Sequence, residues 1–324
     1  IENSKLPVHV IRYEDMLGRE PLNLNLEEHY GYLGGKTVIV TGGAGSIGTE
    51  LCRQIAGGNP RQLVIIERNE SGLYDIVVDL KQEHPELDIV PVLGAVQNRQ
   101  RMEQVFSIHR PDIVFHAAAY KHVPMMEEHP WEAVYNNILG SVEVLELCRD
   151  YQVERCVMVS SDKAVRPTNV MGATKRFMEL LTQSFSALNG TRYMAVRFGN
   201  VIGSSGSVLP LFKRQIENGG PVTVTHPEVT RYFMTIPEAV SLILQAGGLG
   251  NSGEIFILKM GTQVRIVEMA REMITLSGLI PDEDIEIKFT GLRPGEKLYE
   301  ELITQDEGVE KTKYKDIMVA KNGH

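Results

Sequence analysis

The most reactive combination of residues in the chain is the run Ser161, Asp162 and Lys163, which places a hydroxyl, a carboxyl group and an amine side by side. The run directly follows the apolar segment 154–160, whose composition predicts a strand. A carboxyl group and an amine in one site supply an acid and a base for proton transfer. Surface Asp-Lys pairs are common and usually inert, but the carboxyl end of a buried strand is where α/β proteins bind ligands. The position therefore predicts an acid–base centre.

A second reactive position lies just downstream, at the start of a predicted helix over 171–189. Met171 and Lys175 are four residues apart and share one face of that helix, so both side chains are expected to point at the same ligand. Methionine has no exchangeable proton, which leaves Lys175 as the ionisable member of the pair. One interpretation is a fold that binds a nucleotide without catalysis. The other is that Asp162 and Lys163 supply the acid and the base.

A glycine-rich turn follows the first predicted strand, in the segment KTVIVTGGAGSIG over 36–48. Glycines at 42, 45 and 48 permit a tight turn, a close approach of the backbone to a pyrophosphate and close packing of the next helix. The first N–H groups of that helix then meet the phosphate charge. Such a turn can also merely connect a strand to a helix. Its context between a strand and a helix predicts a dinucleotide site.

The choice of dinucleotide depends on Glu67 and Arg68, at the end of the next predicted strand over 62–67. An acidic side chain there binds a free ribose 2′-hydroxyl and repels a 2′-phosphate, whereas an adjacent arginine favours the phosphate. The sequence favours NAD, with NADP as the alternative.

Strand-like and helix-like segments alternate over most of the chain. Further strands are predicted at 88–93, 112–116, 154–160 and 192–198, and helices at 99–109, 131–150 and 171–189. This alternation predicts an α/β protein with a Rossmann-type, doubly wound parallel sheet and a smaller α/β substrate-binding lobe. The expected division is a linker or N-terminal extension over 1–33, a dinucleotide-binding domain over 34–200 and mainly the lobe over 201–324, from which some segments could return to the sheet.

The bulk composition excludes several classes of protein. The net charge of −9 argues against a nucleic-acid or anionic-membrane surface. Three cysteines without disulfide or metal-ligand spacing indicate a reducing cytosol, and no metal site is expected. No apolar run is long enough to span a membrane, so no direct membrane contact is expected. The start at Ile1 and the polar segment 12–21 suggest a piece of a longer protein.

The chain resembles the extended short-chain dehydrogenase/reductase family that modifies nucleotide sugars, and within it the UDP-N-acetylglucosamine 4,6-dehydratases of surface-polysaccharide and glycan synthesis. The resemblance covers about 12–302 and is carried by TGGAGSIG at 41–48, DIVFHAAAYKHVPMME at 112–127, NILG at 137–140, SSDKAVRPTNVMGATK at 160–175, RFGNVIGSSGSVLP at 197–210, TRYFMT at 230–235 and RPGEKLYEEL at 293–302. Met171 in place of the family's tyrosine, and RYEDMLGREP at 12–21, resemble the long, membrane-anchored branch. Ala95 stands where many members carry an aspartate that contacts adenine.

The resemblance implies roles for individual residues. The implied catalytic residues are Ser161, Asp162, Lys163, Met171 and Lys175. The implied cofactor-binding residues are Gly42, Gly45, Ser46, Ile47, Gly48, Glu67, Arg68, Ala117, Ala118 and Lys175. The implied substrate-binding residues are Lys121, Asn137, Asn200, Ser207, Arg231, Arg293 and Glu296. Arg231 and Arg293 are the expected phosphate clamp, since guanidinium binds phosphate oxygens bidentately, and Glu296 is expected to hold a ribose hydroxyl.

The activity implied is oxidation of a UDP-sugar at C4, elimination of water across C5 and C6, and hydride return to C6. Lys163 would be the C5 base, Asp162 the acid for the C6 oxygen, and Ser161 a relay for the O4 proton toward Asp162 or Lys175. A nucleotide-sugar 4-epimerase or reductase and a non-catalytic nucleotide sensor remain as alternatives. By the same resemblance we expect a homo-oligomer, on the cytoplasmic side of a parent protein anchored through a missing N-terminal region.

Overall fold

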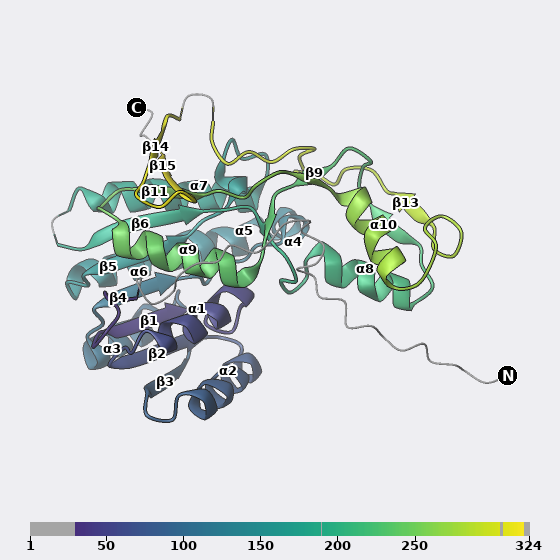
Figure 1. Ribbon diagram of the computed structural model, residues 1–324. Helices are drawn as coiled ribbons and strands as arrows, with labels where there is room; N and C mark the ends of the chain where they lie inside the picture. Colours follow the sequence, from purple (N-terminus) through teal and green to yellow (C-terminus); the bar gives the residue numbers. More distant parts are fainter. Residues whose placement is uncertain (1–29, 189, 305–306, 321–324) are drawn as a thin grey trace.

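The computed structural model describes residues 30–188, 190–304 and 307–320, so nearly all of the predicted linker over 1–33 lies outside the described residues. The core of the fold is one nine-stranded sheet in the order β14-β15-β11-β6-β5-β4-β1-β2-β3 (Figure 1). Strands β1 to β6 and β11 pair in parallel, which confirms the predicted Rossmann-type sheet. Their bounds are β1 Thr37–Thr41, β2 Gln62–Glu67, β3 Asp88–Leu93, β4 Ile113–His116, β5 Arg155–Val159, β6 Arg192–Arg197 and β11 Ile255–Leu258.

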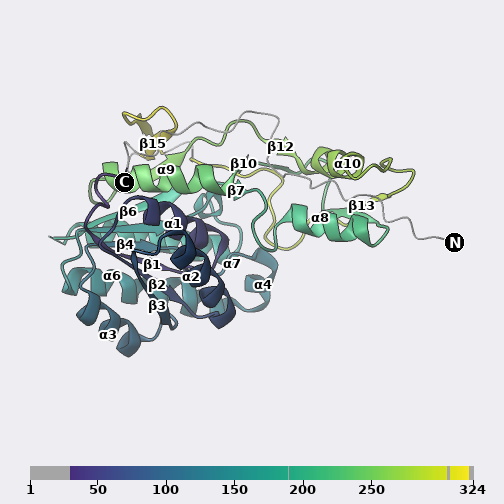
Figure 2. The ribbon, with the colours of Figure 1, turned by 60° about the horizontal axis from the view of Figure 1, so that its bottom comes forward.

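Helices cover both faces of this sheet, because its central strands are apolar on both sides. Helices α1 (Ser46–Gly57), α2 (Glu70–Glu83) and α9 (Ile236–Leu249) bury one face. Helices α3 (Arg99–His109), α6 (Gly140–Asp150) and α7 (Val170–Ser186) bury the other. Figure 2 shows α1 and α9 on one side of the strands and α6 on the opposite side.

The C-terminal part of the chain is divided between the sheet and a lobe. Strand β15 (Ile317–Ala320) pairs antiparallel with β11, and β14 (Val309–Lys311) pairs antiparallel with β15. The lobe has its own apolar core under α8 (Val208–Glu217) and α10 (Ile266–Leu276). Its short strands are β7 Asn200–Val201, β8 Val222–Val224, β9 Thr230–Arg231, β10 Phe233–Met234, β12 Val264–Arg265 and β13 Ile287–Phe289.

The segment predicted as one helix over 131–150 is a compound structure. After α4 (Val123–Glu128), the short α5 (Pro130–Ala133) leads into a π-helix, η2 (Val134–Leu139), and only then into α6. Helices with π geometry are rare and occur often at functional sites. Here the wider turn carries the buried Asn136 and Asn137, whose side chains make contacts described below.

Candidate active site

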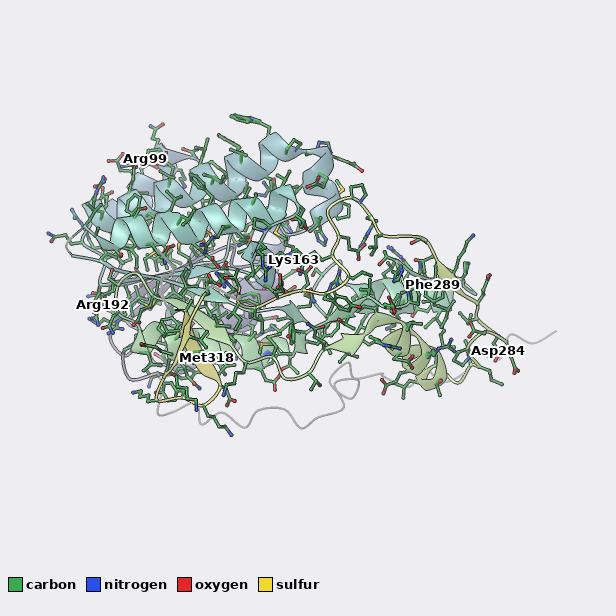
Figure 3. The ribbon with its side chains drawn as sticks, turned by 90° about the horizontal axis from the view of Figure 1, so that it is seen from above. Arg99, Lys163, Arg192, Asp284, Phe289 and Met318 are labelled. Atoms are coloured by element: carbon green, nitrogen blue, oxygen red, sulfur yellow. The ribbon has the colours of Figure 1, made fainter. Side chains whose placement is uncertain are left out.

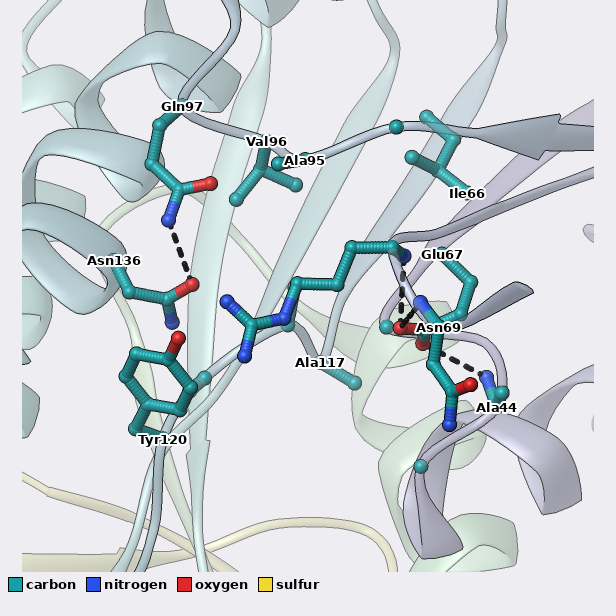
Figure 4. Close-up of a pocket in the computed structure, with 16 residues that line it drawn as sticks. Ala44, Ile66, Glu67, Asn69, Ala95, Val96, Gln97, Ala117, Tyr120 and Asn136 are labelled. Carbon is teal, nitrogen blue, oxygen red and sulfur yellow. Dashed lines mark hydrogen bonds between the residues drawn. The ribbon is translucent and has the colours of Figure 1, made fainter. Parts of the chain in front are cut away.

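Two cavities lie at the carboxyl ends of the parallel strands, as expected for an open α/β sheet. The first, of about 260 Å³, lies over the glycine turn and the ends of β2, β3 and β4 (Figure 4). The second, of about 460 Å³, lies between that edge of the sheet and the lobe. Figure 3 shows Lys163 where the sheet domain meets the lobe that carries Phe289 and Asp284.

The floor of the first cavity is the glycine turn. Gly42 has a φ of +69°, and a Cβ there would lie 2.7 Å from the Cα of Ala118. A Cβ on Gly48 would lie 2.0 Å from the Gly42 carbonyl oxygen, so only glycine lets α1 start this close to the turn. Gly45 is the N-cap of α1 and offers no side chain to its first N–H groups, which leaves them for an anion. The residues present therefore fit the pyrophosphate of a dinucleotide.

Glu67 and Arg68 line the same cavity. The Glu67 carboxylate accepts hydrogen bonds from the backbone N–H groups of Arg68 at 2.8 Å, Asn69 at 2.9 Å and Ala44 at 3.1 Å, and so joins the end of β2 to the glycine turn. The Arg68 guanidinium lies 4.6 Å from the centre of the Tyr120 ring, a cation–π contact. Ala117 and Ala118 complete the wall beside them.

The run predicted as an acid–base centre follows β5 and forms a single 3₁₀ turn, η3 (Asp162–Ala164), capped by Ser161. The Asp162 Oδ1 atom accepts hydrogen bonds from the Ser161 hydroxyl at 2.8 Å and from the Lys163 amine at 3.0 Å. The Lys163 amine also donates to Asn200 at 3.3 Å. Lys163 lines the second cavity, whereas Asp162 is fully buried behind its wall. The amine thus faces the ligand space and the carboxylate holds it from beneath.

Glu300 is a member of this centre that the sequence interpretation missed. It lines the second cavity, and its carboxylate lies 3.9 Å from the Lys163 amine and 4.0 Å from the Arg231 Nε. Burial raises the pKa of Glu300, Lys163 opposes this shift, and Asp162 adds to it. Neither Glu300 Oε2 nor Asp162 Oδ2 has a hydrogen-bond partner among the described residues. Glu300 lies in the segment RPGEKLYEEL, where nothing but tertiary contact distinguishes it from its neighbour Glu301.

Lys175 lies one turn after Met171 on α7, and its amine reaches the sheet. Its amine donates a hydrogen bond of 2.7 Å to the carbonyl of Val159. Burial lowers the pKa of Lys175 to about 8, and Glu179 partly opposes this shift.

The lowered pKa predicts a pH-dependent stability. Between the folded pKa of about 8 and the ordinary lysine pKa of 10.5, the unfolded chain holds a proton that the folded chain has released. Stability therefore rises with pH through this window, by up to about 1.4 kcal/mol per pH unit, and is lost as the pH falls through 8. Urea titrations of the wild type and Lys175→Met at pH 7.5 and 10 should show this gain in the wild type alone; equal changes in both proteins would contradict the assignment.

The second cavity contains most of the residues expected to bind substrate. Lys121, Asn200, Ser207, Arg231, Arg293 and Glu296 all line it. Partial burial lowers the pKa of Lys121. Ser207 is the N-cap of α8, and its buried hydroxyl has no hydrogen-bond partner among the described residues. A hydroxyl at a helix N-terminus inside a cavity suits an anionic group.

The two expected phosphate-binding arginines differ in exposure and in the hydrogen bonds that they make within the protein. Arg231 donates to the carbonyls of Thr230, Leu298 and Lys297 and lies 3.4 Å from the Glu296 carboxylate. These hydrogen bonds join Arg231 to the segment that carries Glu300. Arg293 has a side chain that is 57% exposed and lies 3.4 Å from the Glu296 carboxylate. Arg293 is therefore the better placed of the two for a phosphate.

Several expected site residues do not line either cavity. Met171 packs against Met126 and Ala133 in a small apolar cluster, since a thioether gains more there than in a polar cavity. Asn137 is buried and pairs with both backbone groups of Tyr120, so it supports the site without reaching the second cavity. Ile47 packs against the sheet core. The Ser46 hydroxyl accepts a bond from the N–H of Ser205, which joins the glycine turn to the lobe.

A parallel sheet with this turn, and a Ser-Asp-Lys centre facing a separate lobe, define an extended short-chain dehydrogenase/reductase. Residues 38–322 match the family described as "Polysaccharide biosynthesis protein". The chain belongs to this family.

Named relatives extend the comparison. The chain is 50% identical to "Capsular polysaccharide biosynthesis protein CapD" of Staphylococcus aureus, over 97% of this chain and 53% of that protein. It is 48% identical to "Probable polysaccharide biosynthesis protein EpsC" of Bacillus subtilis, over 92% and 50%. "Uncharacterized membrane protein MJ1061" of Methanocaldococcus jannaschii is 47% identical, over 84% and 81%. The chain spans about half the length of the first two relatives.

Solved structures share the fold. Pen from Bacillus thuringiensis is 34% identical, with a TM-score of 0.82 over 89% of this chain and 90% of that chain. The dTDP-glucose 4,6-dehydratase DesIV from Streptomyces venezuelae, solved with NAD and TYD bound, has a TM-score of 0.73 at 19% identity, over 82% and 88%, and so shows the fold alone. Within 30–188, 190–304 and 307–320, no helix combines the length and apolar character that crossing a membrane requires.

Proposed function

We propose that this chain is the catalytic part of a nucleotide-sugar 4,6-dehydratase that acts on UDP-N-acetylglucosamine for surface-polysaccharide or glycan synthesis. The observation that carries the proposal is the Lys163 amine, which faces the second cavity between the carboxyl groups of Asp162 and Glu300. Elimination of water requires such a base and an acid in one site. The capsular and polysaccharide-synthesis relatives support the substrate class.

The proposed cofactor is NAD, with NADP as the alternative. A bound nicotinamide would take hydride from C4 of the sugar and return it at C6. The chain would hold the pyrophosphate at the α1 N-terminus and a ribose hydroxyl at Glu67, whose carboxylate retains acceptor capacity after its three backbone contacts. Arg68 is the residue that would favour a 2′-phosphate. Enzymatic assay of the cofactor released from purified protein distinguishes the two.

Each residue of the centre then has a proposed step. The Lys163 amine removes the C5 proton and gives a proton back to C5 when hydride returns to C6. Glu300 protonates the departing C6 oxygen, so that the hydroxyl leaves as water. We prefer Glu300 to Asp162 for this step because Glu300 lines the cavity and its raised pKa favours proton retention. Asp162 holds Lys163 and accepts the O4 proton through the Ser161 hydroxyl, which already donates to it at 2.8 Å.

The direct test is turnover of UDP-N-acetylglucosamine in heavy water, followed by proton NMR of the product. A 4-keto, 6-deoxy sugar with deuterium at C5 is expected. A 4-epimer without C5 exchange would favour the epimerase alternative. Bound cofactor with neither product would favour a non-catalytic sensor.

Glu300→Gln tests the acid. The amide keeps the shape of the side chain and removes its proton transfer, so kcat should fall by about 100-fold with the cofactor affinity unchanged. The matched control is Glu301→Gln, whose side chain is 38% exposed and pairs with Arg166 on the surface. It should keep wild-type turnover. If Glu300→Gln also turns over at the wild-type rate, Asp162 is the acid.

Two further expectations concern the protein as a whole. We propose that it forms a homo-oligomer, because apolar side chains of α5, η2 and α7 are exposed together, among them Trp131 at 67%, Tyr135 at 44% and Phe177 at 46%. We also propose a membrane-anchored parent protein facing the cytoplasm, which the half-length coverage of its relatives and a relative named as a membrane protein support. Sedimentation and membrane fractionation of the whole protein test these expectations.

A further inference from the structure

The far end of the first cavity carries an unexplained polar atom. Gln97 lines this cavity, and its Oε1 atom is buried without a hydrogen-bond partner among the described residues. A buried carbonyl oxygen left unpaired costs roughly 1–3 kcal/mol. Figure 4 shows the Gln97 nitrogen turned to Asn136 and the oxygen turned to the Val96 side of the cavity. An unpaired acceptor on a cavity wall is suited to accept a hydrogen bond from a donor on the ligand.

The orientation of the Gln97 amide is determined by a chain of hydrogen bonds. The backbone N–H of Tyr120 can only donate, and it donates to Asn137 Oδ1 at 2.8 Å. That oxygen also accepts from Asn136 Nδ2 at 2.9 Å, which turns Asn136 Oδ1 the other way. Asn136 Oδ1 in turn accepts from Gln97 Nε2 at 2.8 Å. The fixed donor at Tyr120 therefore leaves the Gln97 oxygen, and not its nitrogen, as the free end.

The cavity also indicates which part of the ligand meets this oxygen. The pyrophosphate belongs at the glycine turn and the ribose at Glu67, so the base extends from there toward the loop after β3, where Gly94, Ala95, Val96 and Gln97 form the wall. The side chain of Ala95 has no polar atom. Gln97 is the residue of this loop whose side chain carries an acceptor into the wall.

We propose that Gln97 is the base-reading residue of the dinucleotide site, and that its oxygen accepts a hydrogen bond from the exocyclic amino group of adenine. A small rotation of the side chain brings the oxygen to the cavity surface. Hypoxanthine carries an oxygen in place of that amino group, which would set two acceptors against each other. The site therefore selects an adenine over a hypoxanthine dinucleotide. This inference rests on the cofactor half of the proposed function and involves neither the sugar nor turnover.

The test is cofactor binding measured by calorimetry on the full chain without sugar. NAD and NADP are each compared with the analogue that carries hypoxanthine in place of adenine. The wild type should bind the adenine form about tenfold more tightly, as expected for one good hydrogen bond to a base edge. In Gln97→Met, which has similar length and no acceptor, that ratio should fall to about twofold, mainly by weaker binding of the adenine form.

Two further variants sharpen the result. Gln104→Met makes the same chemical change on the exposed face of α3 and should keep the wild-type ratio. Ala95→Asp in the Gln97→Met background returns an acceptor to the same wall and should restore preference for adenine. An unchanged ratio in Gln97→Met would overturn the proposal. Because the readout is binding alone, that outcome differs from a failure of the proposed function, in which adenine selectivity persists but no 4-keto product forms.

Discussion

Lys163→Met is expected to lower kcat on UDP-N-acetylglucosamine by about 10³- to 10⁴-fold, the upper range for loss of a catalytic base. The Lys163 amine lines the second cavity and is held by Asp162 at 3.0 Å and Asn200 at 3.3 Å. Methionine has similar length but cannot take the C5 proton. Cofactor affinity should not change, since Lys163 does not line the first cavity. Single-turnover formation of the 4-keto product and calorimetry with NAD measure the two quantities.

The control for this variant is Lys213→Met on α8, where the side chain is 47% exposed and lies 4.0 Å from Glu217. It should match the wild type in both assays. Retention of more than a tenth of wild-type kcat in Lys163→Met would remove Lys163 as the C5 base. The elimination would then need another group, for which Lys121 on the same cavity is the nearest in kind.

Arg197→Leu is expected to lower the free energy of unfolding by about 3–5 kcal/mol, the usual cost of removing one partner from a buried ion pair. Arg197 on β6 is fully buried and donates to Glu179 on α7, and also to Glu307 and to the carbonyl of Leu302. Leucine would leave the Glu179 carboxylate buried with a weaker set of partners. The loss also removes a link between the sheet and the C-terminal segment that carries Glu300. Urea denaturation followed by circular dichroism measures it.

Arg192→Leu, at the other end of β6, is the matched control. Its side chain is 41% exposed and pairs with Glu154 at 2.9 Å, and such surface pairs contribute about 0–1 kcal/mol. A loss below 1 kcal/mol in Arg197→Leu as well would mean that the buried network is not a major source of stability.

The fold could be predicted largely from sequence because its signals are local. Apolar runs that end in polar residues mark the strands, and the turn at Gly42 to Gly48 needs glycine for reasons visible in its own backbone. The same locality explains why Ser161, Asp162 and Lys163 were found together. The prediction of one helix over 131–150 missed η2, because a single π turn leaves no periodic signal in the sequence.

The site was harder to predict where the partners of a side chain come from distant parts of the sequence. Met171 and Lys175 do share the helix of the prediction, yet one side chain enters an apolar cluster and the other reaches β5. Arg231 was predicted as a phosphate ligand and does line the second cavity, but it also bonds the backbone carbonyls of Lys297 and Leu298, which the sequence does not reveal. Glu300 joins Lys163 only through folding of a segment more than a hundred residues downstream. These partners depend on tertiary contacts that a sequence motif does not contain.

The antiparallel pair β14 and β15 closes one border of the large sheet. Without it, β11 would present a row of unpaired backbone groups to other molecules, a known route to self-association into aggregates. The outermost strand, Val309–Lys311, is short and exposed and carries a glutamate and a lysine, which discourage sideways pairing. A shortened protein that ends before β14 should therefore precipitate, even though it would retain every residue of both ligand cavities.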